Sequence, residues 1–141
     1  MRQRKGVASR SRGSSLFGQV ATPGGAGPQK SLIGKLVGAN FNSVADQEIT
    51  ITAGYRVTQI IVQNASTSMT NADGGFYSAA AKAGTAIVLA TQVYTALTGA
   101  TIQLNVPIAV VMDGLTSVFF ALTGAQGGAA TADIYIYGLS P

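Results

Sequence analysis

The residue types that most often carry enzyme chemistry are scarce in this sequence. The chain contains no histidine and no cysteine, so the usual general base, the thiol nucleophile and most ligands of transition metals are missing. Carboxylates remain, and Asp46 and Glu48 could form the pair that glycoside hydrolysis requires. Their two-residue spacing at the start of an alternating apolar segment instead favours one face of a solvated strand edge. We therefore predict that the protein is not an enzyme.

Three other short motifs could hold a ligand, and each has a simpler explanation. Asn71 and Asp73 in the sequence NADGG supply too few oxygen ligands for a calcium loop and favour a turn. The glycine-rich runs at residues 24–27 and 124–128 lack the Lys-Ser/Thr and strand-to-helix context of a phosphate-binding loop, so we expect ordinary loops. Asn64 begins a glycosylation triplet, which we discount because no export signal follows the basic start. We expect no cofactor and no metal.

Positive charge is concentrated at the beginning of the chain. Seven of the nine Lys and Arg residues lie within the first 35 positions, which contain no Asp or Glu. After Lys35, two cations stand against five carboxylates, so that part carries a formal charge of −3 although the whole chain carries +4. A basic segment rich in Gly and Ser cannot bury enough apolar surface to fold alone. The sequence thus predicts an extended basic arm over residues 1–35, with a Pro/Gly linker at 21–29, and a body over residues 36–141.

The body shows a two-residue hydrophobic period, which is typical of strands. At 141 residues the chain supports one compact domain, and glycine-rich turns recur at strand-sized intervals. The predicted strands are residues 47–52, 57–63, 76–81, 86–90, 101–106, 117–123 and 133–138. Residues 92–97 could form a helical turn, and Asp113–Gly114 fits a hairpin turn before the strand at 117–123. The pattern predicts an all-β fold, either an antiparallel β-sandwich or a small barrel.

No segment is long enough to span a membrane as a helix. The most apolar windows, residues 85–90 and 106–112, are far shorter than the roughly 20 residues that a spanning helix needs. Charged residues make up only 10% of the chain, well below the usual quarter. We expect a surface so poor in charge to contact other protein and not a membrane.

The arm has two candidate partners, nucleic acid and protein. Its cations would bind phosphates with a strong dependence on salt, or lie along an acidic groove of a neighbouring protein. The apolar side chains in or just after the arm favour protein, and some thirty extended residues could span on the order of 100 Å. The residues expected to bind the partner are Arg2, Arg4, Lys5, Arg10, Arg12, Leu16, Phe17, Lys30, Leu32 and Ile33.

Part of the body resembles a known class of virion protein. The segments GGFYSAAAKAGTAIVLATQVYTALT (74–98), TIQLNVP (101–107) and SVFFALTGAQGGAATADIYIYG (117–138) are similar to small jelly-roll-like structural proteins encoded among the head genes of tailed bacteriophages. The resemblance implies a β-sandwich subunit, commonly trimeric, that decorates or cements a capsid. It also implies the major capsid protein as the partner and the capsid surface of the virion as the location. It implies no active site.

Two other functions stay open on the sequence alone. A carbohydrate- or receptor-binding module of a head fibre or tail could use Tyr94, Tyr135 and Tyr137 as stacking groups. Packing between sheets or subunits is favoured for the last two tyrosines, because no cation follows Lys82. A head-completion or internal head protein could instead contact nucleic acid through the arm.

Overall fold

The computed structural model describes residues 29–140, which form strands and loops without a helix. The strands are β1 (Lys30–Asn40), β2 (Gln47–Thr50), β3 (Arg56–Gln63), β4 (Asp73–Ala79), β5 (Ala83–Val88), β6 (Gln103–Val106), β7 (Ser117–Gly124) and β8 (Thr131–Leu139). The predicted all-β class is confirmed, and all seven predicted strands are present with shifted bounds. Within this part of the chain, no helix has the length and apolar character that crossing a membrane would require.

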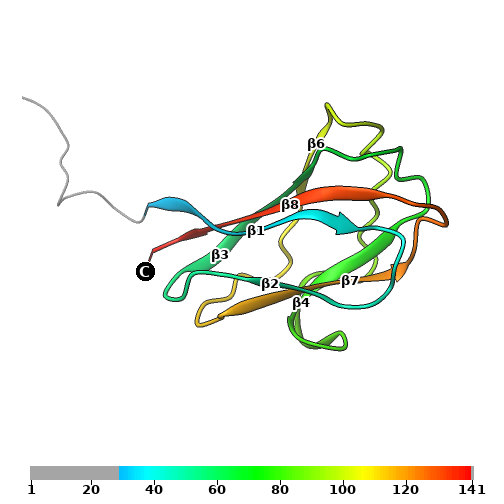
Figure 1. The fold of residues 1–141 in the computed structure, drawn as a ribbon. Helices are drawn as coiled ribbons and strands as arrows, with labels where there is room; N and C mark the ends of the chain where they lie inside the picture. The colour runs from blue at the N-terminus through cyan, green and yellow to red at the C-terminus, as the bar shows by residue number, and fades with distance from the viewer. Residues whose placement is uncertain (1–28, 141) are drawn as a thin grey trace, which may run out of the picture.

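The strands form two four-stranded antiparallel sheets that pack face to face (Figure 1). One sheet has the order β1-β8-β3-β6, and the other has the order β2-β7-β4-β5. The pairing is nested, since β1 pairs with β8, β2 with β7, β3 with β6 and β4 with β5. The pairs β3–β8 and β4–β7 then roll this nested ribbon into two sheets. This is the arrangement of a jelly roll, so the predicted β-sandwich is confirmed.

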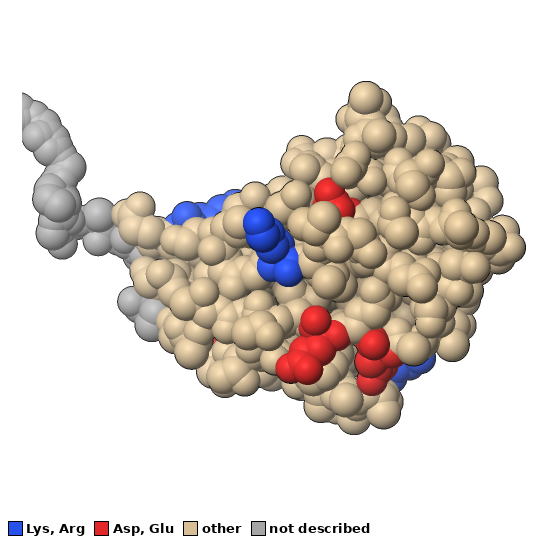
Figure 2. Space-filling view, in the orientation of Figure 1, with Lys and Arg blue, Asp and Glu red and all other residues tan. Residues whose placement is uncertain are grey.

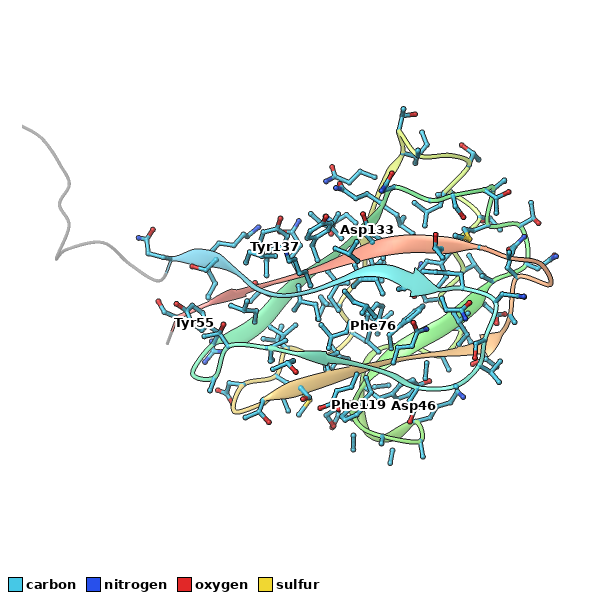
Figure 3. All side chains as sticks on the ribbon, viewed as in Figure 1. Asp46, Tyr55, Phe76, Phe119, Asp133 and Tyr137 are labelled. Atoms are coloured by element: carbon cyan, nitrogen blue, oxygen red, sulfur yellow. The ribbon has the colours of Figure 1, made fainter. Side chains whose placement is uncertain are left out.

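The core lies between the two sheets and has an aromatic centre. The Phe120 ring centroid lies 4.9 Å from those of both Phe41 and Phe76, and the Tyr94 ring meets Phe41 edge-on at 5.1 Å. These four side chains are fully buried, and Figure 3 places Phe76 between the sheets. Edge-to-face and tilted contacts of this kind add to the stabilisation that burial alone provides.

Close backbone packing determines where β4 begins. A Cβ atom on Gly74 would lie 2.4 Å from the Leu122 Cα, and one on Gly75 would lie 2.2 Å from the Val88 carbonyl oxygen. Gly74 also has a φ of +151°, which side-chain-bearing residues rarely adopt. The turn predicted at residues 71–75 is therefore wrong beyond Ala72, because β4 already begins at Asp73 and its glycines permit close approach to β7 and β5.

The connection between β6 and β7 differs from the predicted hairpin at Asp113–Gly114. The two strands belong to different sheets, so no tight turn can join them. Pro107 cannot donate a ladder hydrogen bond, and the chain leaves β3 after Val106. The Ala109 N–H donates to the Ile87 carbonyl at 2.7 Å, and Met112 then bridges to Val57. Residues 107–112 thus leave β6, contact β5 of the second sheet at Ile87 and then return to β3 of the first sheet at Val57.

The alanine-rich segment after β4 forms a hairpin turn. Ala81 and Lys82 both have positive φ values of about 60°, and the Ala83 N–H donates to the Ala80 carbonyl at 3.2 Å. Two successive positive φ values are typical of the hairpin turns that match strand twist. At residues 92–97, the predicted helical turn is reduced to a single turn closed by a 2.9 Å bond from the Leu97 N–H to the Tyr94 carbonyl.

The body begins earlier than the predicted boundary at residue 35. Lys30 already lies opposite Leu139 in the β1–β8 ladder, so Lys30, Leu32, Ile33 and Lys35 belong to a strand and not to the arm. Two glycines obscure this strand in the sequence. A Cβ on Gly34 would lie 2.7 Å from the Ile51 Cγ2, and Gly38 has a φ of +71° where the register shifts.

Candidate functional site

Two tyrosines project side by side from the outer face of the first sheet. Tyr135 and Tyr137 alternate along β8 with fully buried Ile134 and Ile136, and both tyrosines are partly exposed. Figure 3 labels Tyr137 on this side of the ribbon. Cross-strand partners share a face of a sheet, which identifies their neighbours. The tyrosine face, as we name this surface, consists of Tyr135, Tyr137 and their partners Leu32, Lys35, Gln59 and Ile61.

A pocket of about 450 Å³ adjoins the tyrosine face near the start of β1. The Lys30 Nζ donates to the Gln59 Oε1 at 2.5 Å across it. Thr58 is the extra residue at a register shift between β3 and β8, and its buried Oγ1 has no hydrogen-bond partner. The polar pocket, as we name it, is lined by Lys30, Thr58, Gln59, Asn105, Val106, Pro107, Ile108 and Leu139.

A second hollow of about 360 Å³ lies next to the polar pocket and is mainly apolar. Pro107 and Ile108 line both hollows, which are therefore adjacent. Leu89 is 56% exposed and Val93 is 51% exposed although both are large and apolar. The apolar groove, as we name it, is lined by Leu89, Thr91, Gln92, Val93, Pro107, Ile108 and Ala109.

Tyr94 does not belong to a stacking platform, contrary to the prediction. Its side chain is fully buried in the aromatic centre, and its hydroxyl donates to the Gly74 carbonyl at 3.1 Å. Burial raises the pKa of Tyr94 well above its usual range, with smaller contributions from Tyr77 and Asp73. Tyr94 is a core residue, and only Tyr135 and Tyr137 of the predicted aromatic group are accessible.

The residues predicted to bind a partner through the arm fall into two groups. Seven of them lie outside the described residues, namely Arg2, Arg4, Lys5, Arg10, Arg12, Leu16 and Phe17. Of the other three, Ile33 is only 4% exposed and packs in the core, which leaves its side chain little surface for a partner. Leu32 is 48% exposed beside Tyr137, and Lys30 lies at the polar pocket. The alternation of β1 explains this separation, because Leu32 and Ile33 point to opposite faces.

The carboxylates make local contacts. Strand β2 is an edge strand with Asp46 and Glu48 exposed beside it, which confirms the predicted strand edge. Asp46 accepts a hydrogen bond from the Ala81 N–H, and the Glu48 Oε2 accepts one from the Ser117 hydroxyl at 2.5 Å. Figure 3 labels Asp46 near the β4–β5 turn. Residues 29–140 contain no cluster of three or more His, Cys, Asp or Glu side chains that could hold a metal ion.

The glycine-rich run at residues 124–128 closes a loop, as predicted. The Gln126 Oε1 accepts bonds from the N–H groups of Asn71 and Ala72, at 3.0 and 3.2 Å. Its Nε2 donates to the Ser68 carbonyl at 3.2 Å. Gln126 thus ties this loop to the segment before β4. Asn64, the first residue of the glycosylation triplet, donates from its side chain to the Asp133 Oδ2 at 3.0 Å.

Charge is thinly spread over the body. Residues 29–140 carry four cations and five carboxylates, a formal charge of −1, whereas residues 1–28 carry five cations and no carboxylate. Figure 2 shows wide uncharged areas between the few charged side chains on one face. The exposed pair Arg56–Asp113, with a 3.8 Å separation, contributes little to stability.

Neither the polar pocket nor the apolar groove could be predicted from the sequence, because each is formed by segments that are distant along the chain.

Comparisons with protein-family models, with curated proteins and with solved structures find no match to this chain. Any function assigned to the chain therefore depends on its own sequence and surfaces.

Proposed function

We propose that this protein is a non-enzymatic structural subunit of a tailed-phage virion that decorates or cements the capsid. Its arm docks on the major capsid protein, and copies of the body assemble as a trimer on the capsid surface. The observation that carries the proposal is the division of charge. Five cations without a carboxylate lie in residues 1–28, and the body that follows is almost neutral. Such a division suits a body that packs against protein and an arm that reaches an acidic partner.

The jelly-roll topology supports the proposal by analogy only. Jelly rolls occur in viral capsid proteins and also in lectins, and one fold hosts many functions. The exposed apolar side chains give more specific support. Leu32, Leu89, Val93 and Val111 are each about half exposed on a body with few charges. Large apolar side chains on such a surface are typical of contacts with other protein.

In this role the protein reinforces the shell through binding contacts. The basic residues of the arm pair with carboxylates of the capsomer, and Leu16, Phe17 and Leu32 supply apolar contact. Contacts that exist only in the assembled shell stabilise that shell by mass action, and several linked contacts per trimer multiply the effect. Ile33 takes no part, because it is buried in the body.

Deletion of residues 1–28 tests the role of the arm. The eight strands lie within residues 30–139, so the truncated body retains every element of the sandwich and should fold. We expect it to lose co-sedimentation with shells assembled from the major capsid protein of the same genome. The matched control replaces only the five cations of the arm with Gln. Full binding by the truncated body would exclude the arm as the docking element.

The same variants distinguish protein from nucleic acid as the partner. An arm that neutralises five phosphates of duplex DNA would give a slope of about −4.5 in log K against log salt concentration. We expect no such steep dependence and only weak DNA binding near physiological salt. Tight DNA binding with that slope, lost in the Gln variant, would identify a head-completion or internal head protein instead.

A carbohydrate-binding module of a head fibre or tail is the second candidate, and the tyrosine face is the observation that favours it. Two tyrosines on one face, beside the Gln59 amide, supply stacking groups and a hydrogen-bonding group within one surface. A glycan array probed with the body, and with its Tyr135→Ala and Tyr137→Ala variants, tests this function. Binding that both variants abolish would favour the module over the cement protein.

A further inference from the structure

The apolar groove leaves large side chains partly open to water. Leu89 and Val93 form one wall, and Pro107, Ile108 and Ala109 form the other. The hydrogen bond from the Ala109 N–H to the Ile87 carbonyl, at 2.7 Å, holds the second wall against β5. Val110 and Val111 extend the apolar surface and are 43% and 53% exposed. None of the seven lining residues is charged, so the groove is suited to apolar side chains.

The arm joins the body beside the polar pocket, which adjoins this groove. The Ser140 N–H donates to the Gln29 carbonyl at 3.4 Å, so the arm meets the body at the end of β8. Figure 1 shows the start of β1 and the end of β8 together at one end of the sandwich. Lys30 and Leu139, the adjoining pair, line the polar pocket, and that pocket shares Pro107 and Ile108 with the apolar groove. The polar pocket therefore lies between the start of the body and the apolar groove.

The arm contains one segment that matches the groove. Residues 13–19 read GSSLFGQ, so Leu16 and Phe17 stand together between small and polar residues. The twelve residues from Phe17 to Gln29 can span up to about 40 Å. This reach is on the order of the diameter of a compact domain the size of the body. Because the segment is tethered to the body by few residues, its effective concentration at the groove is high.

We propose that the apolar groove binds Leu16 and Phe17 of the same chain in the free subunit. Burial of these two side chains against Leu89, Val93 and Ile108 removes apolar surface from water on both partners. The five cations of the arm all precede Gly13 and stay outside the uncharged groove. They are thus left available for another partner. The inference concerns the free subunit and holds whether or not the protein belongs to a capsid.

A single-tryptophan reporter tests the contact, because the chain contains no tryptophan. Phe17→Trp should show blue-shifted emission and several-fold weaker acrylamide quenching than the same variant in urea. Adding Val93→Asp should shift the emission to the red and restore quenching. The matched control adds Val37→Asp, a substitution at a valine that is 64% exposed on β1, and should leave the emission blue-shifted. Both valines are exposed, so thermal melting should confirm that each variant is folded.

Three results would overturn the proposal. Emission from Phe17→Trp that matches the urea sample would show that the side chain is not bound. A blue shift that survives Val93→Asp would place it elsewhere, and one that disappears on dilution would show binding to a second copy.

A disulfide test provides an independent readout, since the chain has no cysteine. Gly18→Cys combined with Thr91→Cys should oxidise to a crosslinked monomer, with the Gly18→Cys and Val37→Cys pair as the uncrosslinked control. A crosslinked dimer as the main product would contradict docking within one chain. Because neither assay contains a shell, these outcomes are separate from those that test the capsid proposal.

Discussion

The two rows of side chains on β8 differ sharply although they share one strand. Ile134 and Ile136 point into the sandwich and are fully buried, whereas Tyr135 and Tyr137 point outward and are partly exposed. Both rows have the same neighbouring strands, β1 and β3. The inner row is constrained by the volume between the sheets, and the outer row is not. We infer that stability and binding can be separated on this strand by mutation.

The outer face of β8 carries apolar side chains as well as polar ones. Around the two tyrosines, Leu32 and Ile61 accompany the polar residues Gln59 and Lys35. Tyrosine side chains are enriched at surfaces that bind a protein partner. The contrast between the two rows leads to four predictions, whose expected effects on stability decrease from the first to the last.

Removing an inner side chain should cause the largest loss. Ile136 lies opposite Ile60 on β3 and Gly34 on β1, with no exposure to water. Ile136→Ala should lower the free energy of unfolding by about 2–5 kcal/mol, because it removes buried methyl groups and leaves a cavity. Urea denaturation measures this change. A cost below about 1 kcal/mol, less than such truncations of buried side chains usually cause, would mean that the inner row is not the stabilising one.

Asp133 should be the exception within the outer row. It lies two residues before Tyr135 and so shares a face of β8 with both tyrosines, yet it is only 8% exposed. Its Oδ1 accepts a 2.8 Å bond from the Gly38 N–H, and its Oδ2 accepts a 3.0 Å bond from the Asn64 side chain. Asp133→Ala should cost about 2–3 kcal/mol in urea denaturation, because both donors lose a charged acceptor.

The control for Asp133 is Asn64→Gly, which removes one of its two bonds. Asn64 has a φ of +58°, which glycine adopts without strain. The cost should be about 1 kcal/mol. Equal costs for the two variants would show that the bond to Gly38 contributes nothing.

Much of this separation could be predicted from the sequence, because period-two alternation shows which residues share a face. Residues 133–138 and 47–52 were identified in this way. Strand β1 was not, since Gly34 and Gly38 interrupt its alternation and their role is visible only against Ile51 and in the register with β8. The apolar groove was not predicted either. Its walls come from two loops, and local sequence carries no signal for contacts between distant segments.

Tyr94 extends the comparison from exposed tyrosines to a buried one. Burial raises the pKa of Tyr94 above its usual range, while in the unfolded chain it ionises near pH 10. The folded state therefore keeps a proton that the unfolded state loses. The resulting stabilisation is complete below about pH 10 and is lost as the pH rises through the folded pKa.

Urea denaturation between about pH 8 and about pH 11.5, a range that brackets the ordinary tyrosine pKa, should show this loss. The free energy of unfolding should fall above about pH 10, by up to about 1.4 kcal/mol per pH unit for one group. Tyr94→Phe should flatten the slope, and the slope that persists belongs in part to Tyr77, whose pKa burial also raises. An unchanged slope in Tyr94→Phe would show that Tyr94 is not the linked group.

The outer tyrosines should have the smallest effect on stability. Cross-strand pairs on an open sheet face contribute about 0.2–1 kcal/mol each, so Tyr135→Ala and Tyr137→Ala should each lower the free energy of unfolding by less than about 1 kcal/mol. Their effect should appear in binding instead, as a loss of at least about tenfold in affinity for the shell or the glycan. Thr50→Ala, at an exposed position of β2 in the other sheet, is the matched control and should change neither quantity. If the tyrosine variants melt several degrees lower with unchanged binding, the outer row is structural. If they change nothing, the outer row only faces solvent, and the contrast between the two rows concerns folding alone.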